Sequence, residues 1–219
     1  VWGFSNPRAE QPDELVVVGE GGRAFHSDGQ DFVVRETGTT KTLSDVWGSA
    51  TSDVWAVGEK GTVLHFDGER WERQGVGTRR NLTAVWGTFC DDVFIVGRFG
   101  KILHFNGRRW EHQESDTVRN LLDIWGSRSD DVWAVGRDGT IVHYNGRVWR
   151  RIRWDTTEDF HTVFGFASDD VYVLGQAGTM LHFDGERWSR PTSIDRERLL
   201  ASSTASDRRA LVVGEHGRA

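Results

Sequence analysis

The sequence has little cysteine, little proline and no long apolar run, and these shortages exclude several classes of protein. Its only cysteine, Cys90, leaves no internal disulfide framework and no zinc site built from cysteines. No apolar run approaches the ~18 residues that a membrane-spanning helix needs. Lys and Arg number 27 against 33 Asp and Glu, a formal charge of −6. Such a chain lacks the basic field that nonspecific nucleic-acid binding requires, so we expect no nucleic-acid partner.

Tryptophan and glycine are abundant instead. The 219 residues include 11 tryptophans and 26 glycines but three prolines. This combination is typical of a β protein with many short strands and tight turns.

Several residue types recur at an interval of 39 along the chain. The recurring positions are Trp47, Trp86, Trp125 and Phe164; Asp53, Asp92, Asp131 and Asp170; Gly58, Gly97, Gly136 and Gly175; His65, His104, His143 and His182; and Trp71, Trp110, Trp149 and Trp188. Five positions kept in phase without an insertion indicate structural repeats.

One repeat contains four short segments rich in β-branched and aromatic residues, as residues 82–113 show. They read LTAVWG, DVFIVG, KILHFNG and RRWEHQ, and turn-forming residues separate them. No repeat holds the ten or more residues of 3.6-residue periodicity that a helix needs. We therefore predict an all-β fold, a β-propeller whose blades are four-stranded antiparallel sheets.

The phase of the repeat predicts one propeller domain over residues 1–219, with five complete units and half of a sixth. Pro7 and Pro12 fall in a short insertion within the first unit. Because the sixth unit supplies two strands, we expect the chain to be part of a six- or seven-bladed ring, closed by further residues or by a second chain. The units lie near residues 1–42, 43–81, 82–120, 121–159, 160–198 and 199–219.

The repeated residues have structural explanations. Strict periodicity favours the tryptophans as core residues over sugar-stacking platforms. One histidine per blade cannot bring ligands within the ~2.1 Å reach of a zinc ion, so we predict that His65 and its equivalents are buried and hydrogen-bonded, for example to a turn aspartate. The aspartates between the first two strands are expected to accept turn N–H groups. We therefore predict no metal and no cofactor.

The hairpin between the third and fourth strands reads HFDGERW at 65–71 and 182–188, HFNGRRW at 104–110 and HYNGRVW at 143–149. It resembles the Asp-box hairpin of BNR-type propellers, although here the Asp or Asn adjoins the Gly. The whole repeat also resembles the short-repeat propellers of bacterial secreted and surface proteins and, more loosely, tachylectin and WD-repeat blades. The resemblance implies a propeller on a secreted, cell-surface or periplasmic protein, and it leaves the activity open.

A binding site is expected where the repeats differ from one another. In a propeller, the turns between second and third strands share one end with the loops that lead to the next blade, and here both vary. The candidate binding residues at this end are Lys60, Arg98, Phe99 and Arg137. Their charges suit an acidic protein surface or an acidic glycan.

Catalysis finds no support in the sequence, which contains no nucleophile, zinc-protease, P-loop or dinucleotide-binding motif. Tyr144 and Tyr172 occupy positions that Phe or Trp fills in other repeats, so they are expected in the core. We predict a non-catalytic binding or scaffolding propeller with a protein partner. The alternatives are a lectin-like carbohydrate-binding propeller, or part of a sialidase- or glycosidase-type hydrolase with catalytic residues elsewhere.

Overall fold

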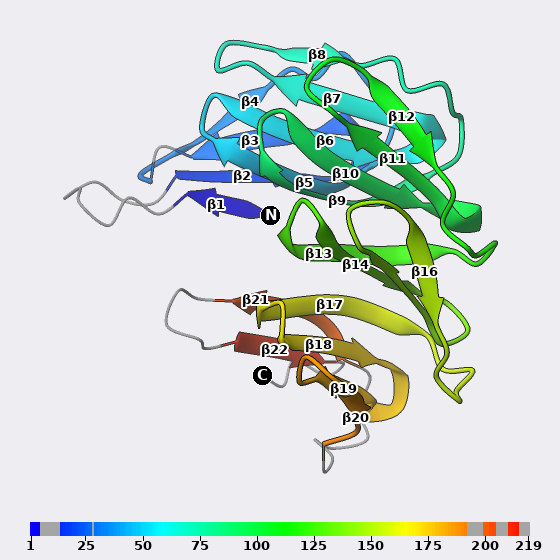
Figure 1. The fold of residues 1–219 in the computed structure, drawn as a ribbon. Helices are drawn as coiled ribbons and strands as arrows, with labels where there is room; N and C mark the ends of the chain where they lie inside the picture. Colours follow the sequence, from blue (N-terminus) through cyan, green and yellow to red (C-terminus); the bar gives the residue numbers. More distant parts are fainter. Residues whose placement is uncertain (5–13, 28, 192–198, 205–209, 215–219) are drawn as a thin grey trace. The chain divides into compact units, whose positions relative to one another are not determined.

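The computed structural model describes residues 1–4, 14–27, 29–191, 199–204 and 210–214 (Figure 1). Every regular element within these ranges is a β-strand or a single-turn 3-10 helix. The all-β prediction is therefore confirmed for the described residues. The insertion with Pro7 and Pro12 lies outside them.

Five antiparallel sheets contain four strands each, with neighbouring strands in chain order. The first contains β1 (Trp2–Phe4), β2 (Glu14–Val18), β3 (Ala24–Ser27) and β4 (Phe32–Arg35). The second contains β5 (Leu43–Ala50), β6 (Asp53–Gly58), β7 (Thr62–Phe66) and β8 (Trp71–Arg73). The third contains β9 (Leu82–Phe89), β10 (Asp92–Gly97), β11 (Lys101–Phe105) and β12 (Trp110–Gln113). The fourth contains β13 (Leu121–Arg128), β14 (Asp131–Gly136), β15 (Thr140–Tyr144) and β16 (Trp149–Ile152). The fifth contains β17 (Phe160–Ala167), β18 (Asp170–Gly175), β19 (Met180–Phe183) and β20 (Trp188–Ser189).

The sixth repeat contributes a two-stranded sheet of β21 (Leu199–Thr204) and β22 (Ala210–Gly214). Single 3-10 turns follow the second strand in four repeats: η1 (Glu20–Gly22), η2 (Glu59–Gly61), η3 (Arg98–Gly100) and η4 (Gln176–Gly178). Five four-stranded sheets and one two-stranded sheet agree with the predicted blades, and each β-sheet is called a blade below.

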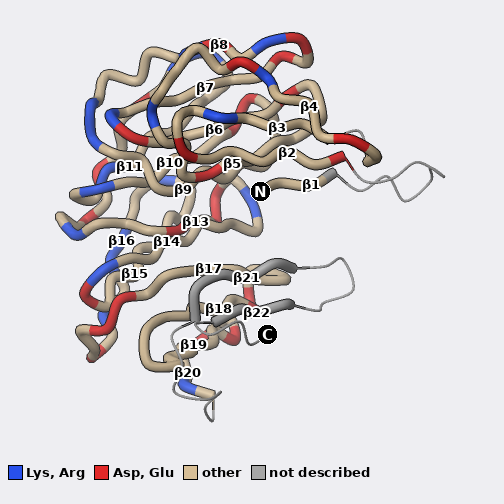
Figure 2. Tube along the Cα trace, turned by 180° about the vertical axis from the view of Figure 1, so that it is seen from behind, with Lys and Arg blue, Asp and Glu red and all other residues tan. Residues whose placement is uncertain are grey.

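The second strands of three blades, β6, β10 and β14, are buried on both faces. In β6 every residue from Val54 to Gly58 is buried, and β14 is buried along its whole length. Sheets that pack face to face on both sides lose water from both faces, so their strands do not alternate between apolar and polar residues. In the fifth blade, β17 and most of β18 carry no charged residue (Figure 2).

The repeated tryptophans lie in the core, as predicted from their periodicity. Five are buried: Trp47, Trp55, Trp71, Trp133 and Trp149. The others that the clusters include are partly buried and pack against core residues: Trp2, Trp86, Trp110, Trp125 and Trp188, together with Trp154, which lies outside the repeat.

The chain divides into two compact units. The first comprises Val1–Ile95 and Leu103–His112, and the second comprises Val96–Ile102 and the described residues from Gln113 onward. Within the first unit β5 packs against β2 and β9, and within the second β17 packs against β13 and β21.

Hydrogen bonds link the first strands of successive blades inside each unit. The Val85 N–H donates to Asp45 Oδ2 over 2.8 Å in the first unit. In the second unit Asp123 Oδ2 accepts from the Val163 N–H at 2.9 Å and from the Thr162 hydroxyl at 2.8 Å. These aspartates fix the register of one blade against the next.

The described residues contain no helix that is long and apolar enough to cross a membrane.

Candidate functional site

The repeated histidines and aspartates meet within single blades. His65 Nε2 lies 2.6 Å from Asp53 Oδ1, and the same pairing joins His104 to Asp92, His143 to Asp131 and His182 to Asp170 at 2.6–2.8 Å. The histidine ring also stacks on the aromatic residue of the second strand, as His143 does on Trp133 at 3.8 Å between centroids. The predicted hydrogen bond between the histidine and a turn aspartate is confirmed.

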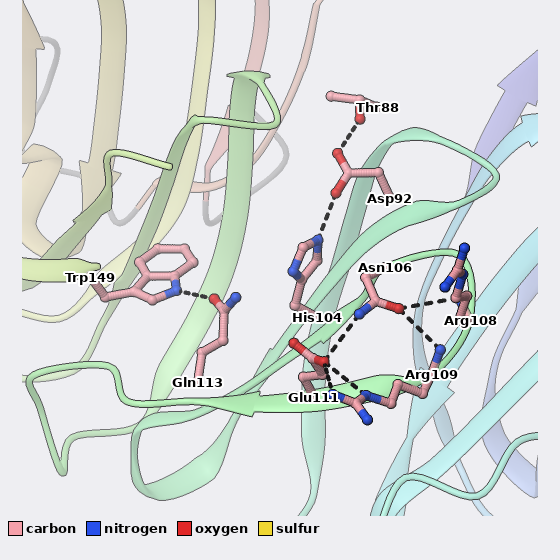
Figure 3. A network of polar contacts seen from close by, with 9 residues as sticks. All are labelled: Thr88, Asp92, His104, Asn106, Arg108, Arg109, Glu111, Gln113 and Trp149. Atoms are coloured by element: carbon pink, nitrogen blue, oxygen red, sulfur yellow. Dashed lines mark hydrogen bonds and ion pairs between the residues drawn. The ribbon is translucent and has the colours of Figure 1, made fainter. Parts of the chain in front are cut away.

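A hydroxyl completes the network in three blades. The Ser49, Thr88 and Ser127 hydroxyls each donate to the second carboxylate oxygen of the paired aspartate, and Figure 3 shows the chain Thr88, Asp92, His104. Burial alone would raise the pKa of Asp53, but hydrogen bonds from His65 and Ser49 and the charge of His65 hold it below its ordinary value.

This order of groups differs from that of a hydrolytic triad. In a triad the histidine contacts the nucleophilic hydroxyl and the carboxylate contacts the far side of the histidine. Here the carboxylate of Asp131 lies between Ser127 and His143, so the hydroxyl donates to the carboxylate and not to the histidine. The arrangement joins the first three strands of a blade.

Two expectations about these residues were wrong. We expected Asp53 and Asp131 to accept backbone N–H groups, but they bind side chains. Each is the first residue of a strand and therefore faces the histidine of the neighbouring strand. The four histidines are partly buried, with 17–27% of the side chain exposed, and not fully buried.

The backbone N–H groups of a turn are instead bound by the Asp or Asn of the hairpin between the third and fourth strands. Asp67 Oδ1 accepts the N–H groups of Glu69 and Arg70, both at 2.9 Å. Asn106 does the same for Arg108 and Arg109 at 3.1 Å (Figure 3). The glycine of this hairpin packs on the turn between first and second strands, so these two turns share one end of each blade, here called the hairpin end.

The opposite end of each blade carries the turn between second and third strands and the loop that leads to the next blade. We call it the loop end. Lys60 N–H donates to Asn81 Oδ1 at 3.1 Å, and Phe99 N–H donates to Asn120 Oδ1 at 2.9 Å. A Cβ at Gly61 would lie 2.0 Å from the carbonyl oxygen of Thr78. The turn and the loop therefore lie at the same end of the blade, as predicted, and hydrogen bonds hold them together.

All four predicted binding residues lie at the loop end and are exposed. Lys60 belongs to the first unit, whereas Arg98, Phe99 and Arg137 belong to the second. Arg137 Nε faces Asp159 at 3.9 Å, so its charge is partly matched inside the protein.

The sequence did not single out Val118, although its loop was among the variable ones. Val118 is 78% exposed and Phe99 is 60% exposed. A Cβ at Gly100 would lie 2.0 Å from the Thr117 carbonyl oxygen, so the peptides next to Phe99 and Val118 are in contact. We call Arg98, Phe99 and Val118 the apolar patch. The sequence feature that could have pointed to Val118 is an aliphatic residue at a position where other repeats have Thr40, Arg79 and Thr157.

The turn residue that corresponds to Phe99 keeps the same backbone in other blades while its side chain changes. Lys60, Phe99, Asp138 and Ala177 all have positive φ, between 52° and 60°. This left-handed conformation is uncommon outside glycine and carries a steric cost. The scaffold therefore presents a cation, an aromatic ring, a carboxylate or a methyl group in one fixed geometry.

Metal ligation is not indicated in the described ranges, where no group of three or more His, Cys, Asp or Glu could hold a metal ion.

Comparisons with known proteins support the fold. Neither the protein-family models nor the curated proteins give a match. Among solved structures, the chain is similar to the WD40 repeats of RRP9, with a TM-score of 0.74 and 10% identity over 89% of this chain and 67% of that one. U3-55K matches with the same values. YCF48 from Cyanidioschyzon merolae gives a TM-score of 0.50 and 13% identity over 93% of this chain and 89% of that one. At these identities the likeness shows a β-propeller fold and no activity.

Proposed function

We propose that this protein is a non-catalytic β-propeller that binds a protein partner through the loop end of its blades. The observation that carries the proposal is the apolar patch of Arg98, Phe99 and Val118. A ring and an aliphatic side chain are exposed there beside an arginine, on backbone that hydrogen bonds hold in place.

The composition of the patch suits a protein interface. Aromatic residues and arginine are enriched where partners lose most solvent, and they contribute most of the measured binding energy. Arg98 has no ion-pair partner among the described residues, so its guanidinium is available to a carboxylate or a backbone carbonyl. Arg137 adds a second cation in the same unit, although Asp159 partly offsets it.

A lectin-like role is less well supported. Repeated sugar pockets need near-identical side chains in each blade, whereas the turn residues here are Lys60, Phe99, Asp138 and Ala177. The tryptophan rings that could stack on a sugar are buried or partly buried, as Trp71 and Trp149 are at 7% and 3% exposure. The resemblance of the repeat to bacterial surface propellers supports a place on a secreted, cell-surface or periplasmic protein, which is part of the proposal.

Site-specific photo-crosslinking tests the proposal. A benzophenone amino acid placed at position 99 should cross-link one protein partner in cells that produce the chain. The matched control carries the same group at position 89, because Phe89 is 67% exposed but lies at the hairpin end.

The proposal predicts a discrete cross-linked product from position 99 and none of that mass from position 89. Equal products from both positions, or a product from position 89 alone, would place the binding surface elsewhere.

A further inference from the structure

A second surface at a loop end, in the first unit, has a different chemistry. An open hollow of about 770 Å³ lies beside η2 and the end of β8. Four of its lining side chains are cationic, Lys41, Lys60, Arg73 and Arg79, and none of the described lining residues is acidic. We call this hollow the basic pocket.

The four cations come from three separate segments. Lys60 lies in the turn between β6 and β7, Arg73 ends β8, and Arg79 lies in the loop that follows. Lys41 lies in the loop before β5. None of them has an ion-pair partner among the described residues. Glu59, next to Lys60, accepts the Thr42 N–H at 3.4 Å, and Glu72, next to Arg73, pairs with Arg70 at 2.6 Å.

The pocket therefore concentrates four positive charges on a chain whose formal charge is −6. Like charges brought together repel each other, and the repulsion falls when an anion binds between them. Two of these cations lie at positions where the other blades have uncharged or acidic residues. Lys60 corresponds to Phe99 and Asp138, and Arg79 corresponds to Val118.

Backbone between the cations is open as well. Gly75 has no heavy atom within 4 Å of where a Cβ would lie, and Gly77 has a positive φ of 66°. Both glycines are exposed and line the pocket, so their peptide groups are accessible to a ligand.

We propose that the basic pocket binds a short acidic segment of a protein partner, with two or more carboxylates placed among Lys41, Lys60, Arg73 and Arg79. The volume of the hollow falls within the ~300–1,000 Å³ range of ligand pockets, so a single carboxylate would leave most of it empty. Arginine binds carboxylates through two N–H groups, and the lysines add charge without fixed direction. The choice of a peptide rests on the proposed function.

The probe is the peptide N-acetyl-hexaaspartate amide, titrated into the ¹⁵N-labelled full chain while the amide resonances of Gly75 and Gly77 are followed. Tripolyphosphate is titrated in parallel, since phosphate groups would meet the same cations. We expect saturable shifts of both glycines with the peptide. The affinity should fall severalfold between 50 and 200 mM salt because exposed charges are screened.

Substitutions identify the side chains. Arg79→Ala should weaken peptide binding about fivefold, and Lys60→Ala combined with Arg79→Ala should weaken it at least tenfold. Ala177 adopts a φ of 52° at the position equivalent to Lys60, so alanine fits that turn. Arg108→Ala removes the same charge from the hairpin end of the same unit and should change the affinity less than twofold.

Each other outcome overturns the inference. Tripolyphosphate binding without peptide binding would make this a phosphate site, and no shift with either probe would leave no site. An equal loss with Arg108→Ala would show nonspecific attraction. Peptide titration reports on the basic pocket and cross-linking from position 99 reports on the apolar patch, so failure here and failure of the apolar patch are separable results.

Discussion

His26 packs against Phe66 with ring centroids 4.4 Å apart, and its Nε2 atom is buried with no hydrogen-bond partner among the described residues. The histidines at the same position of the next four repeats each contact an aspartate. In the first repeat the position of this aspartate is occupied by Glu14, which is exposed. Burial, with a smaller effect from the charge of Arg35, lowers the pKa of His26 from 6.5 to about 4.

The first prediction is a loss of stability in mild acid. The unfolded chain takes up a proton at His26 near pH 6.5, whereas the folded chain does so only near pH 4. Stability present above pH 6.5 should therefore decrease as the pH falls towards 4. Urea unfolding at a series of pH values measures this decrease.

Glu14→Asp provides the matched variant, because it places the shorter carboxylate where the other blades have it. It should raise the pKa of His26 and flatten the decrease, as an NMR titration of the ring would report. An unchanged pKa in the variant would mean that the missing aspartate is not the cause.

Removing the carboxylate of Asp131 should destabilise the fold. Asp131→Ala leaves the His143 ring and the Ser127 hydroxyl without their partner in a mostly buried place, at a cost of ~1–3 kcal/mol. Asp130→Ala, next to it but 64% exposed, should change the free energy of unfolding by less than ~0.5 kcal/mol. Similar losses in both variants would contradict the structural role of the network.

The close approach at the loop end makes Gly61 sensitive to a single methyl group. Its φ is +69°, and a Cβ would lie 2.0 Å from the Thr78 carbonyl oxygen. Gly61→Ala should therefore lower the melting temperature by several degrees, while Gly75→Ala, with open space around it, should lower it little. Thermal unfolding followed by circular dichroism distinguishes the two.

Asp123 should give the opposite pH dependence to His26. Burial raises its pKa, against the effect of hydrogen bonds from Val163, Thr162 and Ile124. The folded chain then holds this proton to a higher pH than the unfolded chain, so the contribution of Asp123 to stability falls as the pH rises from about 4. In Asp123→Asn that part of the pH dependence should disappear, which unfolding at matched pH values would show.

The repeat carried most of the fold prediction. The segments expected at 92–97 and 101–107 contain the strands β10 and β11, because buried β-branched runs between turn residues leave few alternatives. The pairing of His65 with a turn aspartate followed from its place in an otherwise apolar strand. Which donor each aspartate binds did not follow. Asp53, which begins β6, and Asp67, which follows β7, carry the same side chain and differ in the groups that face them.

The sequence predicted where the candidate binding residues lie, but not which residues they contact. The variable turns gave Lys60, Arg98, Phe99 and Arg137, and all four are exposed at the loop end. The sequence could not show that Arg137 faces Asp159, nor that Val118 lies close to Phe99. Both depend on a loop that leads to the next blade folding back onto a turn, which no local pattern encodes.

The affinity for the cross-linked partner tests the central proposal most directly. Isothermal titration should be run with the purified partner and the wild-type chain, Phe99→Ala and Phe89→Ala. Both substitutions remove one exposed ring, and Ala177 shows that alanine fits the backbone at the position equivalent to Phe99. We predict that Phe99→Ala weakens binding at least tenfold, about 1.4 kcal/mol, while Phe89→Ala stays within twofold of wild type. An unchanged affinity for Phe99→Ala together with a large loss for Phe89→Ala would contradict the account.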